Sequence, residues 1–365
     1  MPAKQAVTIS DVARQAGLSV ATVSRALNRS PKLDPQTAKR VFEAVEQLGY
    51  NAAPITGRAT ERSRMREKCY TVEVILSPQP EQKDMLQLNF FSNVYTGIQS
   101  FFLQAGNITT GLVTWDCSWG QISDLPPALT ERLKRADAIM LAGDLAVELT
   151  LALREFTPNL IAIFSNEMNT LPIDSVANNN FMAGMEAARL LIDNGFPEIG
   201  FLASPDRISS HELRLNGAMI QTTRSLGYDH FHFRRAKSTD DADIREAIEA
   251  WLSEPVHPSA FILPYARAAS LLRKIAAAHG LRCPDEISIL CFDQPKMLPD
   301  HFLFTHWNTH PRKLGIKAAQ RIVQRLLTPY TEDSAHCIML PCELVPGDSV
   351  RRFGSVPSSS PEKTT

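Results

Sequence analysis

The stretch from Val7 to Asn28, VTISDVARQAGLSVATVSRALN, constrains the fold most, because it holds two short helical patterns around one glycine. In the first pattern, apolar residues recur at the i, i+3, i+4, i+7 spacing of one buried helix face: Ile9, Val12, Ala13 and Ala16. Gly17 tolerates the positive φ that ends a helix, and Ser19 is a good N-cap for the next helix. The stretch is therefore predicted to form two helices joined by a tight turn.

The second predicted helix has an inward face and an outward face. The inward face carries small and apolar residues: Thr22, Val23, Ala26 and Leu27. Val20, Ala21 and Arg25 are left on the outer side. A small residue near a helix N-terminus allows close approach to base edges, and an arginine can bond the O6/N7 pair of guanine. This pattern is typical of a helix that reads DNA; the alternative is a helical pair that only packs a core.

A third helix is predicted to begin at Asp34-Pro35, where an N-cap residue precedes a proline at the first helical position, and to end at Gly49. Its apolar residues would close a three-helix core: Ala38, Val41, Phe42, Val45 and Leu48. We therefore expect a first domain of helix-turn-helix type at residues 1–50.

Together with Arg40-Val41 and Leu48-Gly49-Tyr50, the stretch from Val7 to Asn28 resembles the DNA-binding headpiece of the lac repressor/galactose repressor family of bacterial regulators. The resemblance implies a homodimer that binds a pseudo-palindromic double-stranded operator, because one small head reads too few base pairs for genomic specificity. Repression that a ligand relieves is commonest in that family. The expected DNA-binding residues are Thr8, Ser19, Val20, Ala21, Thr22, Ser24, Arg25, Asn28 and Tyr50.

The net charge of −1 hides an asymmetry along the chain. Residues 1–68 hold twelve lysines and arginines against six acids, a balance of +6, and the remainder carries −7. A basic head on an acidic body suits a protein that meets phosphates at one end only.

The six cysteines form no CxxC pair, and we interpret them as reduced thiols, mostly buried. No apolar run follows Met1, and no stretch is long enough to span a bilayer. We therefore expect a cytoplasmic protein that does not contact a membrane.

The segment 51–69 is polar and basic, and we expect it to be a hinge or linker. In the resembling family this segment forms a short helix on DNA and carries a leucine that wedges into the minor groove. Here Gly57 interrupts the segment and Ala59 stands at the leucine position. We therefore expect either a weak hinge that bends DNA less than is usual, or a flexible linker that contacts phosphates.

From Thr71 onward, predicted strands alternate with predicted helices, which indicates parallel sheets covered on both faces. The expected strands are 72–76, 108–114, 136–141, 160–164, 198–202, 260–263 and 288–292, and clear helices cover 91–105 and 182–194. The resemblance extends over this region and implies a two-lobed body like that of periplasmic sugar-binding proteins. It implies crossovers near Leu171 and Trp307 and an effector-binding and dimerisation domain at 70–350. The tail at 351–365 is rich in serine and proline, and we expect it to be disordered.

In open α/β sheets, ligands bind beyond the carboxyl ends of the strands, which in this architecture face a cleft between the lobes. Asp293 directly follows the strand SILCF and could accept hydrogen bonds from ligand hydroxyls, or it could cap a turn. Arg214 matches the effector-contacting arginine of the family and could fork onto hydroxyls or a carboxylate, or it could be a solvated helix charge. Phe91 and Trp307 could stack on a ligand, and either could equally be core.

Two departures from the family pattern concern the ligand. Tyr265-Ala266 replaces the usual Asn-Asp after the strand AFIL, and Asn179-Asn180 replaces the usual Asp-Asn. The loss of two acidic positions favours a phosphorylated or acidic sugar, or a flatter ligand that stacks on Tyr265, over an ordinary neutral hexose. The expected effector-binding residues are Phe91, Arg214, Tyr265, Asp293 and Trp307.

We expect no metal and no cofactor. His306 and His310 have an i, i+4 spacing, which binds a metal on a helix, but residues 304–309 are predicted to be a strand or crossover and no third ligand is near. No phosphate loop, GxSxG or HExxH motif is present. An enzyme is therefore not expected. The leading hypothesis is a DNA-binding transcriptional repressor that responds to a small ligand. The alternatives are a DNA-binding regulator with an effectorless or partner-driven body, and a small-molecule-binding protein with an accessory head.

Overall fold

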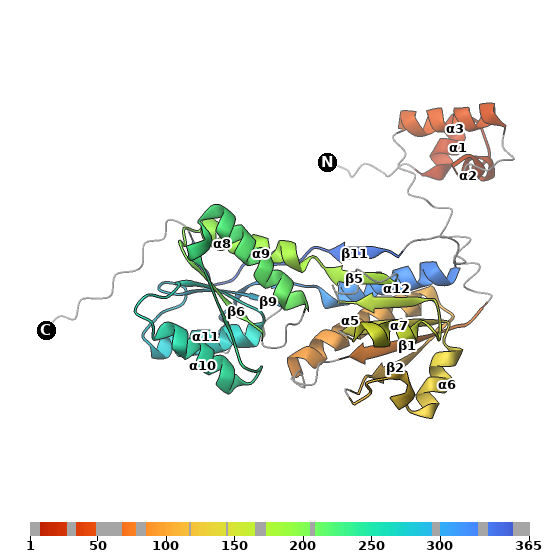
Figure 1. The fold of residues 1–365 in the computed structure, drawn as a ribbon. Helices are drawn as coiled ribbons and strands as arrows, with labels where there is room; N and C mark the ends of the chain where they lie inside the picture. The colour runs from red at the N-terminus through yellow and green to blue at the C-terminus, as the bar shows by residue number, and fades with distance from the viewer. Residues whose placement is uncertain are drawn as a thin grey trace. The chain divides into compact units, whose positions relative to one another are not determined.

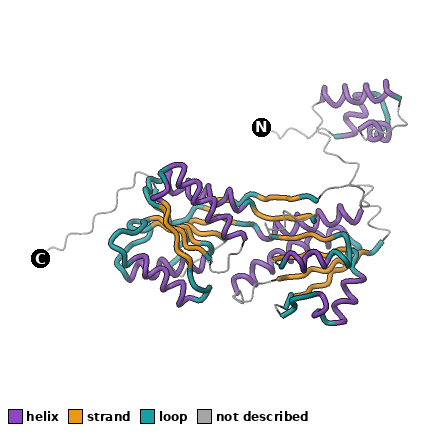
Figure 2. Tube along the Cα trace, viewed as in Figure 1, coloured by secondary structure: helices purple, strands orange, loops and turns teal. Residues whose placement is uncertain are grey.

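The computed structural model describes residues 8–27, 34–48, 68–77, 85–116, 118–143, 145–164, 173–204, 209–293, 300–327 and 335–352 (Figures 1 and 2). The chain divides into two compact units. One comprises Met1–Cys69 with Ala105–Asn107, and the other comprises Tyr70–Gln104 and Ile108–Thr365. The expectations for Asn28, Gly49, Tyr50, the hinge up to residue 67, Leu171 and the tail from residue 353 lie outside the described residues.

The described part of the first unit contains three helices, which are α1 (Ile9–Ala16), α2 (Val20–Leu27) and α3 (Pro35–Leu48). Gly17 ends α1 with a φ of 63°, which confirms the predicted turn. Asp34 caps α3 as predicted, because its Oδ2 accepts a hydrogen bond of 2.9 Å from the Thr37 amide. The core of this unit consists of Val12, Ala13, Ala16, Val23, Ala26, Val41 and Ala44, with Leu18 and Val45 packed against it.

The prediction that Phe42 belongs to this core is wrong, because 45% of its surface is exposed. Successive residues of an α-helix point about 100° apart, so the face that buries Val41 turns Phe42 toward solvent. Ala44 takes the inward position three residues after Val41 and is buried. Ala44, and not the larger Phe42, therefore belongs to the core of this unit.

The second unit contains two six-stranded sheets, in the orders β11-β5-β4-β3-β1-β2 and β12-β10-β9-β8-β6-β7. All pairings are parallel except that of β12 with β10, so the predicted parallel sheets are confirmed except at one edge. The strands of the first sheet are β1 (Tyr70–Ser77), β2 (Ile108–Thr114), β3 (Ala138–Gly143), β4 (Leu160–Ile163), β5 (Asp174–Asn178) and β11 (Cys337–Leu340). Those of the second are β6 (Ile199–Ala203), β7 (Phe231–Arg235), β8 (Ala260–Leu263), β9 (Ser288–Phe292), β10 (Thr305–Asn308) and β12 (Glu343–Val345).

Helices lie on the faces of both sheets, and their inward sides form separate hydrophobic cores (Figure 1). The helices are α5 (Met85–Ala105), α6 (Pro127–Arg135), α7 (Val147–Leu153), α8 (Asn180–Asp193), α9 (Ser209–Ser225), α10 (Asp241–Leu252), α11 (Ala266–Ala278) and α12 (Pro311–Leu327), with short 3-10 turns at Ile122–Asp124 and Tyr228–His230. No described helix is both long enough and apolar enough to cross a membrane.

The chain passes between the two sheets three times. It leaves the first sheet between β5 and α8, returns between β10 and α12, and crosses once more between β11 and β12. The passage near Trp307 was predicted, since Trp307 lies in β10. The third passage was not predicted, because β11 and β12 are short and carry no distinctive pattern.

Helices α8 and α9 pack together with unusually close backbones, and Figure 1 shows them side by side. A Cβ added at Gly184 would lie 2.1 Å from the carbonyl oxygen of Arg214, and one at Gly217 would lie 2.1 Å from that of Phe181. Both positions therefore require glycine for close contact between the helices.

Replacing Gly184 with alanine is therefore expected to destabilise the protein by about 1–3 kcal/mol, because the added methyl group meets rigid backbone rather than a movable side chain. Chemical denaturation would measure the loss. Gly120→Ala is the matched control, since the nearest atom to its Cβ would be 3.8 Å away. Equal stability of the two variants would contradict the close-packing argument.

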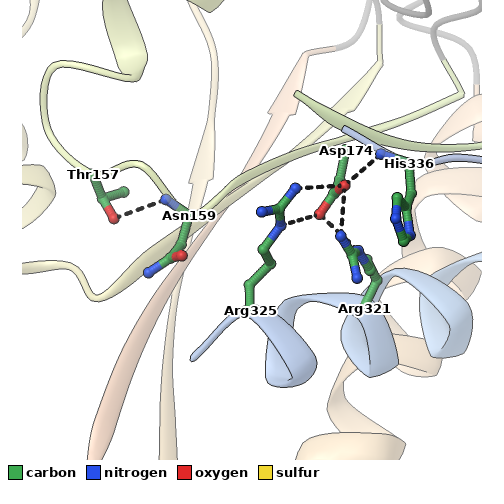
Figure 3. Close-up of polar contacts among 6 residues, drawn as sticks. All are labelled: Thr157, Asn159, Asp174, Arg321, Arg325 and His336. Atoms are coloured by element: carbon green, nitrogen blue, oxygen red, sulfur yellow. Dashed lines mark hydrogen bonds and ion pairs between the residues drawn. The ribbon is translucent and has the colours of Figure 1, made fainter. Parts of the chain in front are cut away.

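A buried ion cluster joins three segments that adjoin the crossovers, namely β5, α12 and the residue before β11 (Figure 3). Asp174, at the start of β5, is only 1% exposed and binds Arg321 and Arg325 of α12 through both of its oxygens, at 2.6–3.1 Å. The backbone amide of His336, just before β11, donates to Asp174 Oδ1 at 2.8 Å. Burial raises the pKa of Asp174, but the hydrogen bonds from Arg325, Arg321 and His336 outweigh it, so the pKa lies below its ordinary value.

The expectation of mostly buried cysteines is wrong for the described residues. Of these, only Cys291 is buried, Cys283 and Cys342 are half-buried, and Cys69 and Cys337 are exposed. Burial raises the pKa of Cys283 to about 12 and that of Cys342 to about 11. Burial also raises the pKa of Cys291, where no solvent reaches the side chain.

With a thiol-alkylating reagent at pH 8, we expect Cys69 and Cys337 to react first in the native protein. A thiol with a pKa of about 11 has on the order of 0.1% thiolate at pH 8, so Cys342 should react slowly, and Cys291 should not react. Peptide mapping by mass spectrometry after timed alkylation measures each site. Labelling of Cys291 at the rate of Cys69 would contradict its burial.

Candidate functional site

The exposed face of α2 forms the first candidate site. Val20 is 44% exposed, and Ala21 and Arg25 are also exposed, as predicted. Ser19 caps the helix, since its Oγ accepts a 3.1 Å hydrogen bond from the Thr22 amide. Among the described residues, Arg25 forms one hydrogen bond, from its Nε to the Ala21 carbonyl oxygen at 3.3 Å, which leaves most of the guanidinium on the surface.

The other predicted DNA-binding residues that the structure describes lie at helix ends or beside the same face. Thr8 is exposed and caps α1 through a reciprocal pair of hydrogen bonds with Asp11. The hydrogen bonds that Asp11 Oδ2 accepts from the Thr8 hydroxyl, at 2.6 Å, and from the Thr8 backbone amide lower the pKa of Asp11, so its carboxylate stays charged at the N-terminus of α1. Thr22 and Ser24 are half-buried on α2.

A side chain from α3 fixes the turn between α1 and α2. Arg40 donates a 2.8 Å hydrogen bond from Nη2 to the carbonyl oxygen of Ala16, the last residue of α1. The sequence comparison identified Arg40 as part of the motif without a role for it. The geometry assigns one, because this bond satisfies a carbonyl that the end of the helix leaves unpaired. The exposed residues of α2 are therefore held on a rigid three-helix support.

The second candidate site lies at the carboxyl ends of the strands of the second sheet. Arg214 of α9 is only 4% exposed, which rules out a solvated helix charge. Its Nε donates to Asn180 Oδ1 at 3.0 Å, and its Nη1 donates to the carbonyl oxygen of Pro264 at 3.2 Å, directly after β8. The guanidinium carbon lies 4.3 Å from the centre of the Phe292 ring at the end of β9.

A chain of hydrogen bonds joins Arg214 to Asp293. Beyond Arg214, Asn180 donates to the Asn178 carbonyl oxygen at 3.3 Å, and the Asn178 amide group donates to the Thr309 carbonyl oxygen at 3.0 Å. Thr309 Oγ1 then donates to Asp293 Oδ1 at 2.7 Å. Asn178 and Thr309 lie at the first and second crossovers, so the chain connects two predicted effector residues through the segments that pass between the sheets.

Asp293 has an unusual backbone conformation, with a φ of 65° directly after β9. Residues other than glycine rarely adopt this region, and such strain is often found at functional positions. The Asp293 amide donates to the Trp307 carbonyl oxygen at 3.0 Å, which fixes the carboxylate at the end of the sheet. This placement agrees with the predicted position at a strand end.

Tyr265 follows β8 and is half-buried, and its ring centre lies 6.0 Å from that of His211. His211 is buried on α9, and no described residue bonds its Nδ1. Burial, with a smaller contribution from the charge of Arg214, lowers the pKa of His211 to about 3, so the ring is neutral at pH 7. His211 and Thr309 were not predicted as site residues, and Asn180 was noted only as a departure from the family pattern. The available signal was their position beside the motif of Arg214 and after the two crossovers.

Phe91 and Trp307 are both packed among apolar side chains. Phe91 is buried in contact with the rings of Phe90 and Phe164, with centroids 6.0 and 6.1 Å apart. Trp307 is buried in the core of the second sheet, and its indole Nε1 has no partner in the structure. A direct ligand contact from either side chain stays a prediction.

The two histidines of the predicted i, i+4 pair have separate partners. His306 Nδ1 lies 2.8 Å from the Phe304 carbonyl oxygen inside the sheet. His310 Nε2 lies 2.7 Å from the Glu343 carboxylate at the start of β12. Among the described residues, no group of three histidines, cysteines or carboxylates is placed to hold a metal ion.

Comparisons with known proteins match both units. Residues 8–52 match the family described as bacterial regulatory proteins, lacI family, and residues 188–350 match a periplasmic binding protein-like domain. Catabolite control protein A of Priestia megaterium is 28% identical over 294 residues, which cover 80% of this chain and 83% of that protein. The probable HTH-type transcriptional repressor ExuR of Bacillus subtilis is 24% identical over 355 residues, covering 95% and 99%.

Among solved structures, the lac repressor dimer bound to operator and the anti-inducer ONPF matches with a TM-score of 0.63. The match covers 94% of this chain and 99% of that chain at 20% identity. This likeness shows that the two share a fold.

Proposed function

Because the chain belongs to the lacI family of bacterial regulatory proteins, we propose that it is a DNA-binding transcriptional repressor whose operator affinity depends on a small ligand. The observation that carries this proposal is the exposed face of α2 within a matched helix-turn-helix unit. The relatives that the chain matches are named as repressors or as a control protein, which favours a regulator over an enzyme or a binding protein with an accessory head.

The proposed partner of the first unit is double-stranded operator DNA. Val20, Ala21 and Arg25 would contact base edges, and Thr8, Ser19, Thr22, Ser24, Asn28 and Tyr50 would hold phosphates or helix ends. A single headpiece reads few base pairs, so we propose a homodimer on a two-fold symmetric site. A protein that regulates the bacterial chromosome acts in the cytoplasm.

The proposed ligand site of the second unit consists of Arg214, Tyr265 and Asp293 at the strand ends. Since the hydrogen-bond chain from Arg214 to Asp293 passes through two crossovers, a ligand that moves either residue would shift the segments between the sheets. A shift of these segments would change how two heads of a dimer are presented to DNA.

Selection from random double-stranded DNA with the full-length protein tests the DNA-binding part. We expect a pseudo-palindromic consensus whose affinity falls steeply with salt, because phosphate contacts release counterions. If the protein retains no DNA sequence above the background at 100 mM salt, the proposal is overturned. Gel-filtration light scattering at the same protein concentration would measure whether the chain is dimeric.

A further inference from the structure

The guanidinium of Arg214 is buried with only neutral partners. An arginine has five N–H donors, and in this structure Nε binds an amide oxygen, Nη1 binds a carbonyl oxygen, and the carbon faces an aromatic ring. Among the described residues, no carboxylate forms an ion pair with Arg214. No described residue of any kind accepts a hydrogen bond from its Nη2. A buried charge is ordinarily paired, so this guanidinium has capacity for an anion.

Asp293 does not neutralise Arg214 by direct contact. Three side chains, those of Asn180, Asn178 and Thr309, stand between the guanidinium and the carboxylate in the hydrogen-bond chain. The positive charge of Arg214 reaches its neighbours, since it helps to keep His211 neutral and partly offsets the effect of burial on the Cys342 thiol. A neutral His211 adds no second positive charge to the site.

The start of α8 adds no negative charge to this site. Asn179 caps the helix by accepting a hydrogen bond of 3.2 Å from the Met182 amide, and Asn180 is the partner of Arg214. Both residues are amides, which are neutral at every pH that leaves the protein folded. Arg214 and Asp293 therefore supply opposite charges at the two ends of a neutral bridge.

The carboxylate of Asp293 has one oxygen that accepts no hydrogen bond from a described residue. Its Oδ1 accepts the hydrogen bond from Thr309, and no described residue donates to its Oδ2. An ionised carboxylate is only an acceptor, so Oδ2 would bind a donor such as a ligand hydroxyl.

We propose that the ligand of this site is a hydroxylated compound with an anionic group, a carboxylate or a phosphoryl group, which Arg214 binds while Asp293 accepts a hydroxyl. This inference rests on the ligand-responsive function proposed above and specifies its chemical class. A planar carboxylate fits the fork of a guanidinium in two parallel hydrogen bonds, and phosphoryl oxygens fit it as well.

Isothermal titration of the full-length protein tests this class with sets that differ in one group. Each set contains a hexose, its uronate and its terminal phosphate, for glucose, galactose and mannose. We expect one set in which the acid or the phosphate binds at least about 10-fold more tightly than the neutral sugar, as one additional charged hydrogen bond provides. Comparing the uronate with the sugar phosphate in each set shows whether the anionic group is a carboxylate or a phosphoryl group.

Two variants separate charge recognition from folding. Arg214→Gln should reduce the acid-to-neutral affinity ratio to about one, whereas Arg214→Lys should keep part of it. Arg245→Gln is the matched control, since Arg245 is a half-exposed arginine of α10 that pairs only loosely with Glu249, at 3.9 Å. A merely structural role of Arg214 would weaken all members of a set equally and leave the ratio unchanged.

Three results would overturn the inference: a neutral sugar that binds as tightly as its acid and phosphate, a ratio that persists in Arg214→Gln, or no binding in any set. DNA selection is measured without these compounds, so its failure concerns the regulatory function alone. A neutral sugar that releases the protein from selected DNA would leave that function standing and remove only the proposed anionic class.

Discussion

Replacing Arg25 with alanine is expected to weaken binding to the selected DNA site by between about 30-fold and 10⁴-fold. One arginine that contacts a guanine through both acceptor atoms contributes about 1–3 kcal/mol, and a two-fold symmetric dimer has two such contacts. The Arg25 side chain is exposed, and among the described residues it bonds only its own helix, so its loss should leave the fold intact. Fluorescence anisotropy with the selected site and with a scrambled site measures the effect.

Lys39→Ala is the matched control for that experiment. Lys39 is an exposed cation of α3 that lies 4.0 Å from Glu43, and it is not on the α2 face. Its removal should weaken specific and scrambled DNA to a similar, small extent, because phosphate contacts carry no sequence information. If Arg25→Ala reduced both affinities by the same factor, the assignment of Arg25 to base contact would be wrong.

Replacing Asp174 with asparagine is expected to destabilise the protein by about 3–5 kcal/mol. The substitution keeps the size of the side chain but leaves Arg321 and Arg325 buried beside a neutral amide. The amide nitrogen of asparagine would also face donors, since all of the recorded hydrogen bonds to this side chain come from N–H groups. Urea denaturation at pH 7, followed by circular dichroism, measures the difference.

The Asp174 cluster should also make the stability of the wild-type protein depend on pH. The pKa of Asp174 is below its ordinary value of 3.8 in the folded state, so the carboxylate contributes fully above that value. The contribution is lost as the pH falls through the lower, folded pKa. Asp174→Asn should lack this acid-dependent loss. Asp193→Asn, at an exposed position 3.5 Å from Arg189, should show the same acid-dependent loss as the wild type.

Local sequence patterns predicted most elements of both units, because each pattern depends on residues close together in the chain. The caps at Gly17, Ser19 and Asp34 follow from side-chain chemistry within three residues. Strands β2, β8 and β9 have the bounds that their apolar runs predicted. The placement of Asp293 at a strand end was equally local.

The predicted site was incomplete where its contacts are distant in the chain. Arg214 and Asp293 were named from the family pattern, but the bridge between them was not. Its central bond, from Asn178 to Thr309, joins residues 131 positions apart. No periodicity within a helix or strand carries information about such a partner.

The sequence by itself determined the helix-turn-helix unit, the alternation of strands and helices, and the charge difference between head and body. These features depend on backbone preferences and on the spacing of apolar side chains, which act over a few residues. Only the tertiary structure decided that Phe42 is exposed, that the chain crosses between the sheets three times, and that Asp174 is buried between two arginines. Each of these outcomes depends on which surfaces meet after folding. Asp174 and His336, which form one of these contacts, are 162 residues apart in the chain.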